Sequence, residues 1–89
     1  MSLGKVLITG SSGGLGNHLA AYYSEKGHEI LLHGRNEEKL IQIQKKINKN
    51  GKKAKYVVAD LNNEKDLKLL CSQAKKENIK ILINNAGII

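Results

Sequence analysis

The sequence has no proline, no phenylalanine and no tryptophan, and it has a single cysteine among its 89 residues. One cysteine excludes a disulfide within the chain, and the leucines beside Cys71 predict a buried thiol. No apolar run approaches the roughly 20 residues of a bilayer span, and the N-terminus lacks the apolar core of a secretion signal. We therefore expect a cytoplasmic protein without a membrane partner.

The chain is basic, with a formal net charge of +7, which raises the question of a polyanionic partner. Most of the excess lies late in two expected helices or just after one of them, at Lys39, Lys45, Lys46, Lys49, Lys52, Lys53, Lys55, Lys75 and Lys76. Positive side chains near helix C-termini complement the helix dipole, and the interleaved aromatic residues on which bases stack are missing. We expect no nucleic-acid partner. A basic nucleic-acid-binding protein, whose binding would weaken steeply with salt, is kept as an alternative.

Short apolar stretches alternate with helical patterns along the chain. The expected strands span residues 5–9, 30–33, 56–59 and 79–83, and the expected helices span 14–26, 36–50 and 64–76. The side chains expected to face inward are Leu15, Leu19 and Tyr23 in the first helix, Leu40, Ile43 and Ile47 in the second, and Leu67, Leu70, Cys71 and Ala74 in the third. The connections are short, so the strands should run parallel with right-handed crossovers. The pattern predicts an open α/β sheet and one domain over residues 1–89.

A glycine-rich loop, Thr9-Gly10-Ser11-Ser12-Gly13-Gly14-Leu15-Gly16, joins the first strand to the first helix. Residues without side chains let a phosphate approach the backbone, and the free N–H groups of the first helical turn attract its charge. A mononucleotide phosphate loop would end in Gly-Lys-Ser or Gly-Lys-Thr, but here Asn17 and His18 follow. The simple GxGxxG pattern does not match either. The loop predicts an anion site, with a purely structural turn as the alternative.

Two further motifs accompany this loop. Asp60-Leu61 follows the third strand, and Asn84-Asn85-Ala86-Gly87 follows the fourth. With the TGxxxGxG pattern of the loop, the sequence resembles the short-chain dehydrogenase/reductase family over essentially its whole length. The resemblance implies a partial Rossmann-like, doubly wound parallel sheet of about four strands in the order 3-2-1-4, with three helices.

The resemblance also implies a role for each matching residue. The turn would be shaped by Gly10, Gly14 and Gly16, and the pyrophosphate and adjacent ribose would be contacted by Ser11, Ser12 and Leu15. Asp60 would accept a hydrogen bond from the adenine amino group, with the Leu61 backbone beside it. The nicotinamide-side ribose would be lined by Asn84, Asn85, Ala86 and Gly87, which would also tie the middle strands together. The plainer alternatives are that Asp60 begins a helix and that the asparagines form a turn.

The end of the second strand bears on the choice of cofactor. An NAD-preferring site presents a carboxylate about 20 residues beyond the loop, but this region reads Leu32-His33-Gly34-Arg35-Asn36. A guanidinium can bind a 2′-phosphate through two hydrogen bonds. We therefore expect NADP(H) in preference to NAD(H), with Arg35 and Asn36 among the binding residues. A solvated loop charge is the alternative for Arg35. We expect His33 to fill the strand and no metal site to form.

Family members use a serine and a YxxxK pair downstream of the NNAG motif, where this sequence stops. Its own YxxxK, from Tyr22 to Lys26, lies two turns into the first helix and is expected to be unrelated to catalysis. The sequence thus predicts the cofactor-binding N-terminal part of a short-chain oxidoreductase, truncated before its catalytic residues. A non-catalytic dinucleotide-binding module or sensor is the second hypothesis. The apolar edge of strand 79–83 would be covered by another copy of the chain or by the missing remainder.

We expect the purified 89-residue chain to show no dehydrogenase turnover with alcohols or carbonyl compounds. The reason is that no residue matches the serine and the Tyr–Lys pair that handle the proton in this family. The check is cofactor absorbance with a panel of substrates. Cofactor-dependent turnover above a protein-free control would contradict the prediction.

Overall fold

The computed structural model describes residues 3–86. Its strands are β1 (Lys5–Ile8), β2 (Ile30–Gly34), β3 (Ala54–Val58) and β4 (Ile79–Ile83). They form one sheet in the order β3-β2-β1-β4, and every pair is parallel. The predicted strand order is confirmed.

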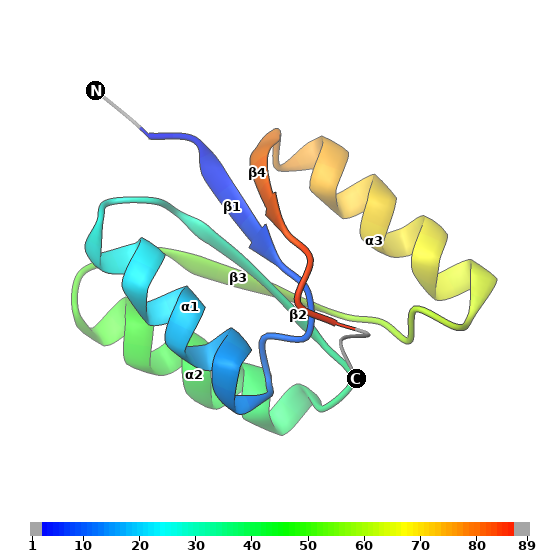
Figure 1. Cartoon of the computed structure of the whole chain (residues 1–89), viewed down its shortest axis with the longest axis horizontal. Coiled ribbons are helices and arrows are strands. Elements are labelled where there is room, and N and C mark those ends of the chain that lie inside the picture. The colour runs from blue at the N-terminus through cyan, green and yellow to red at the C-terminus, as the bar shows by residue number, and fades with distance from the viewer. Residues whose placement is uncertain (1–2, 87–89) are drawn as a thin grey trace.

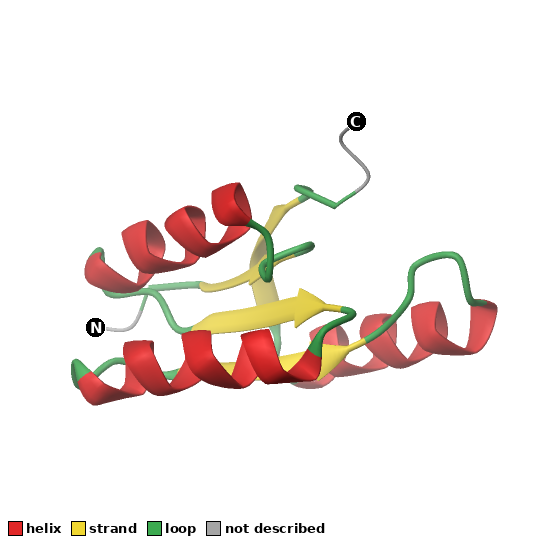
Figure 2. Cartoon of the chain, turned by 90° about the horizontal axis from the view of Figure 1, so that it is seen from below, coloured by secondary structure: helices red, strands yellow, loops and turns green. Residues whose placement is uncertain are grey.

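Three helices cover the two faces of this sheet: α1 (Gly14–Glu25), α2 (Glu37–Lys49) and α3 (Glu64–Lys76). Figure 1 shows α1 and α2 side by side on one face and α3 on the other, and Figure 2 shows the sheet between them. The architecture is therefore doubly wound, as predicted. No helix in the described part of the chain is long and apolar enough to cross a bilayer.

The two central strands carry apolar side chains on both faces, as a sheet covered on both sides requires. On β1, Val6 and Ile8 point into the core beneath α1 and α2, whereas Leu7 joins Leu70 of α3 on the opposite face. All three β1 side chains are at most 5% exposed. Alternation along one strand thus supplies both cores.

Side-chain caps begin two of the helices. Asn36 accepts a hydrogen bond from the Lys39 amide at 3.1 Å, and Asn63 accepts one from the Asp66 amide at 3.0 Å. Acidic residues occupy the first turns of α2 and α3 and lysines occupy their last turns, which suits the helix dipole. The sequence-predicted starts of these helices are confirmed.

The face of α1 that packs on the sheet differs from the prediction. The buried residues are Gly16, Ala20 and Ser24, whereas Leu15 is 62% exposed. Leu19 and Tyr23 are only partly buried, at the border of the core. Small side chains let the helix backbone approach the sheet closely. The face of α1 that packs on the sheet is therefore a row of small residues, and the leucines lie next to this row on the helix surface.

The prediction for α3 was also wrong in part. Leu70 is buried and Ala74 is partly buried, but Cys71 is exposed and Leu67 is 42% exposed. In the described structure α3 lies alone on its face of the sheet. It therefore buries a narrow line of residues, and positions on its flanks have no neighbouring helix against them.

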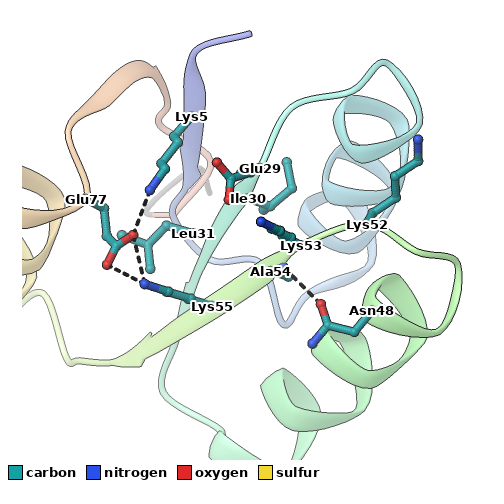
Figure 3. A pocket seen from close by; sticks show the side chains of 10 residues that line it. All are labelled: Lys5, Glu29, Ile30, Leu31, Asn48, Lys52, Lys53, Ala54, Lys55 and Glu77. Atoms are coloured by element: carbon teal, nitrogen blue, oxygen red, sulfur yellow. Dashed lines mark hydrogen bonds and ion pairs between the residues drawn. The ribbon is translucent and has the colours of Figure 1, made fainter. Parts of the chain in front are cut away.

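One carboxylate forms ion pairs with two lysines at the amino edge of the sheet, which is the edge opposite the glycine loop. The Glu77 carboxylate, just after α3, is only 10% exposed and lies 3.1 Å from Lys5 Nζ and 3.0 Å from Lys55 Nζ (Figure 3). Hydrogen bonds from Lys55 and then Lys5 hold the pKa of the Glu77 carboxyl below its ordinary value. One carboxylate thus links α3 to β1 and β3.

We expect Glu77→Gln to lower the free energy of unfolding at neutral pH by about 1 kcal/mol, because both lysines are partly solvated. A lowered carboxyl pKa stabilises the fold above the unfolded-state value, and this contribution is lost as the pH falls through the folded value. The deficit should therefore shrink below about pH 4. Urea titrations at both pH values measure it.

Glu64→Gln is the control for this comparison, because Glu64 is 83% exposed and lies 3.8 Å from Lys68. Its effect should stay below about 0.5 kcal/mol. Equal deficits for the two variants at neutral pH would contradict the assignment.

Candidate functional site

A cleft of about 460 Å³ opens at the carboxyl edge of the sheet. It is lined by Gly10, Ser12, His33, Gly34, Arg35, Asn36, Ala59, Asp60, Leu61, Asn62 and Ala86. His33 and Gly34 end β2, and the other lining residues follow β1, β2, β3 and β4, so segments far apart in the sequence meet there. In doubly wound folds, ligands bind at the carboxyl edge of the sheet. The site lies where the strand order reverses, so that the connections on its two sides run in opposite directions.

The glycine loop requires glycine at two positions for steric reasons. Gly10 has a φ of +68°, and a Cβ on it would lie 3.1 Å from Ala86 Cα. A Cβ on Gly16 would lie 2.7 Å from Ser11 Cα. Gly14 differs, because a Cβ there would meet no protein atom within 4 Å. The space beside Gly14 is open, and its glycine is not explained by packing within the described residues.

The N-terminus of α1 is uncapped. Its N-cap residue, Gly13, offers no side-chain acceptor, and the first turn has no acidic residue. Among residues 3–86 the amides of Gly14, Leu15 and Gly16 have no hydrogen-bond acceptor. Unpaired N–H groups and the positive end of the helix dipole together favour an anion at this position.

The hydroxyl of Thr9 joins the glycine loop to the segment after β4. Its oxygen accepts hydrogen bonds from the Asn85 amide at 2.9 Å and the Ala86 amide at 3.0 Å. It lies 3.2 Å from Asn84 Oδ1, to which it can donate. Asn85 adds a bond from its side-chain amide to the Gly10 carbonyl at 3.2 Å. Both asparagines thus hold the loop, and Gly87 lies outside the described residues.

Ser11 is fully buried, and its hydroxyl forms hydrogen bonds to the protein backbone. The hydroxyl donates to the Ile8 carbonyl and accepts from the His33 amide at 3.0 Å, and the Ser11 amide donates to the His33 carbonyl at 2.6 Å. The side chain expected to contact a pyrophosphate is therefore turned into the protein. Ser12 lines the cleft instead, and Gly34 leaves room for it, since a Cβ there would lie 2.7 Å from Ser12 Oγ.

His33 is a residue whose part in the site the sequence did not reveal. Its side chain lies beneath the cleft, 2% exposed, between the Gly10 amide and the Ala59 carbonyl. Burial lowers the pKa of the imidazole, and the hydrogen bond to Ala59 partly opposes this. The available indication was a polar residue in an otherwise apolar strand directly before the turn at Gly34.

Arg35 and Asp60 lie on the far side of the cleft from the segment after β4. Arg35 is exposed and follows β2, whereas Asp60 follows β3 and is partly buried. Asp60 Oδ1 accepts from the Asn62 amide at 2.9 Å, and the Asp60 amide donates to Asp66. Asp60 therefore takes part in the turn before α3 and also lines the cleft, whereas Asn63 is the residue that caps α3.

The YxxxK segment of α1 lies outside the cleft lining. Tyr22 is 54% exposed, with Lys26 Nζ 5.3 Å from its ring centre. Tyr23 packs edge-on against His28. These contacts stabilise the end of α1 and bring no proton donor to the cleft. Nowhere in residues 3–86 do three histidine, cysteine or acidic side chains gather as metal ligands.

Comparison with known proteins agrees with this geometry. A family model described as short chain dehydrogenase matches residues 4–89. A glucose 1-dehydrogenase from Gluconobacter oxydans is 36% identical over 86 residues, covering 93% of this chain and 32% of its own length.

Solved structures give the same picture. An alcohol dehydrogenase from Comamonas testosteroni, specific for bulky-bulky ketones, superposes with a TM-score of 0.92 at 29% identity and covers 99% of this chain and 36% of its own. A short-chain dehydrogenase from Sphingobium yanoikuyae in complex with NADPH gives 0.89 at 33% identity, covering 97% and 35%. The chain spans about a third of the length of these proteins. Together with the motifs at the cleft, these matches show that the chain belongs to the short-chain dehydrogenase/reductase family.

Proposed function

We propose that this chain is the NADP(H)-binding portion of a short-chain oxidoreductase that transfers hydride between the cofactor and a carbonyl or alcohol substrate. The observation that carries the proposal is the uncapped N-terminus of α1, which opens beside the cleft at the carboxyl edge of the sheet. A pyrophosphate supplies the acceptors that the amides of Gly14, Leu15 and Gly16 lack within the described chain.

The two ends of the cleft suit the two halves of a dinucleotide. On the proposed assignment, Asp60 and Leu61 receive the adenine, with the carboxylate oxygen not used in the turn as acceptor. Ser12 lies near the pyrophosphate, and the Asn84–Gly87 segment lies toward the nicotinamide-side ribose. The bound cofactor supplies the hydride, and the residues of this chain bind it and orient it.

Arg35 supports the preference for NADP(H). The fold itself accepts either cofactor, because similar structures include a complex with NADPH and an NAD+-bound xylitol dehydrogenase. In this chain an exposed guanidinium follows β2 and lines the cleft together with Asn36. A 2′-phosphate would bind two of its N–H groups, whereas the hydroxyl of NAD would offer it no charge.

The proposal also includes what covers the exposed edge of the sheet. β4 is an edge of the described sheet, and Leu82 on it is 61% exposed. This supports coverage of the edge by another copy of the chain or by further polypeptide. The motifs and the family are compatible with a cytoplasmic location.

Gly14 provides a direct test of the dinucleotide site. We expect Gly14→Ala to weaken NADPH binding by at least about tenfold, because its methyl group would occupy the path of the pyrophosphate. Its melting temperature should be unchanged or slightly raised, since the methyl meets no protein atom and alanine favours helix. Calorimetric titration and thermal melts measure the two effects.

Gly16→Ala is the comparison variant, and it should lose stability as well as binding because its Cβ collides with the loop backbone. Equal NADPH affinities for the wild-type chain and Gly14→Ala, or no binding by the wild type, would overturn the proposed site.

Arg35→Asp tests the choice of cofactor. The variant should bind NADPH about 30-fold more weakly, from the loss of charge-assisted hydrogen bonds. It should then bind NADH more tightly than NADPH. Lys39→Asp makes the same charge change at an exposed site outside the cleft lining and should keep the preference for NADPH. Equal affinities of the wild type for the two cofactors would refute the assignment of Arg35.

A further inference from the structure

The His33 ring joins two segments that carry the proposed site. The Gly10 amide donates to Nδ1 at 3.0 Å, and Nε2 lies 2.9 Å from the Ala59 carbonyl oxygen. Gly10 begins the glycine loop, and Ala59 directly precedes Asp60. The backbone of His33 is bonded to Ser11 through both its amide and its carbonyl. Every polar atom of this residue is thus used to hold the cleft.

The partners of the ring admit only one protonation state. An amide N–H can only donate and a carbonyl oxygen can only accept, so Nδ1 must carry a lone pair and Nε2 must carry the hydrogen. A second proton, on Nδ1, would face the Gly10 N–H. The hydrogen bond would then be lost inside a buried site, where an unpaired donor is costly.

We propose that His33 is the positioning residue of the glycine loop, and that its neutral ring, bonded at once to Gly10 and Ala59, makes dinucleotide affinity fall when the ring gains a proton. This inference rests on the proposed dinucleotide site. The mechanism is a change in the loop: without the bond to Nδ1, Gly10 is released from its conformation at φ +68° and the amides at the start of α1 are less well aligned.

Charged groups around the ring come from several elements. Asp60 and Arg35 line the same cleft as His33, where a carboxylate favours the protonated ring and a guanidinium opposes it. The carboxylate of Asp66, in the first turn of α3, accepts a hydrogen bond from the Asp60 amide. Glu37, at the start of α2, is bound by a tyrosine hydroxyl. The described residues of the glycine loop and of the segment after β4 have no ionisable side chain. Burial lowers the pKa of the His33 imidazole below its ordinary value, and the hydrogen bond to Ala59 partly opposes this. The acceptor that the Gly10 amide requires at Nδ1 also favours the neutral ring.

The sign of the pH dependence follows from linkage. Affinity is complete while the ring is neutral and falls as the pH drops through the pKa of His33. Reciprocally, a bound dinucleotide must lower that pKa further, because it favours the ordered loop. A histidine that responded only to the charge of the ligand would show the opposite sign, because a nearby anion favours the protonated ring and raises its pKa.

Nuclear magnetic resonance of the ¹⁵N-labelled chain tests the link without any cofactor. We expect the ring nitrogen shifts of His33 to report hydrogen on Nε2 at pH 7, and the Gly10 amide to shift with the same midpoint as the ring. A ring with hydrogen on Nδ1, a Gly10 amide that does not follow the ring, or a ring that stays neutral until the chain unfolds in acid would overturn the proposal.

Two substitutions test the two hydrogen bonds of the His33 ring separately. His33→Asn places an amide oxygen near the position of Nδ1, so it keeps an acceptor for Gly10 and cannot titrate. His33→Gln reaches instead toward Ala59 with its amide nitrogen and leaves Gly10 without an acceptor. Thermal melts establish that each variant folds before binding is compared.

NADPH titrations between pH 5 and 8 then give the expected pattern. His33→Asn should bind nearly as well as the wild type at pH 8, and His33→Gln about tenfold more weakly. The wild type should lose about tenfold more affinity than His33→Asn on going to the acid limit; protonation of the 2′-phosphate affects both equally. Parallel pH profiles would overturn the inference. An absence of NADPH binding at every pH would refute the proposed function instead, and the resonance measurements would still decide the role of His33.

Discussion

The hydroxyl of Thr9 is the contact on which the cleft depends. One oxygen, at the end of β1, accepts the amides of Asn85 and Ala86 beyond the end of β4. The two strands are neighbours in the sheet, but Asn85 lies 76 positions after Thr9 in the sequence. By binding two consecutive amides, Thr9 brings Ala86 against Gly10, so that little room is left for a side chain on Gly10.

The glycine loop is shaped as much by its neighbours as by its own composition. Gly10 lies against Ala86, Gly16 packs over the start of the loop, and Ser11 turns inward to meet β2. Once these contacts are made, the amides at the start of α1 have no acceptor within the described chain. No buried side-chain polar atom of the described residues lacks a hydrogen-bond partner, and the unpaired amides mark where the charge of a ligand would lie.

The two edges of the sheet differ in how their charged groups are paired. At the amino edge a single carboxylate, Glu77, forms ion pairs with two lysines and links α3 to the sheet. At the carboxyl edge the helix dipole of α1 is left open and Arg35 stands beside the cleft. Ion pairs stabilise one edge, whereas at the other edge Arg35 has no ion pair among residues 3–86, which suits this edge to an anionic ligand. The two apolar cores, one on each face of the sheet, pack against the strands that connect these two edges.

The sequence by itself determined the alternation of strands and helices, the places where the second and third helices begin, and the place of the glycine loop. These features depend on residues within a few positions of one another, and the family motifs supplied the strand order. Only the tertiary structure decided that the small residues around Ala20 rather than Leu15 pack on the sheet, that Cys71 is exposed, and that His33 holds Gly10. Each of these depends on atoms that are distant in the sequence, because burial and hydrogen-bond partners across a sheet are set by which elements become neighbours.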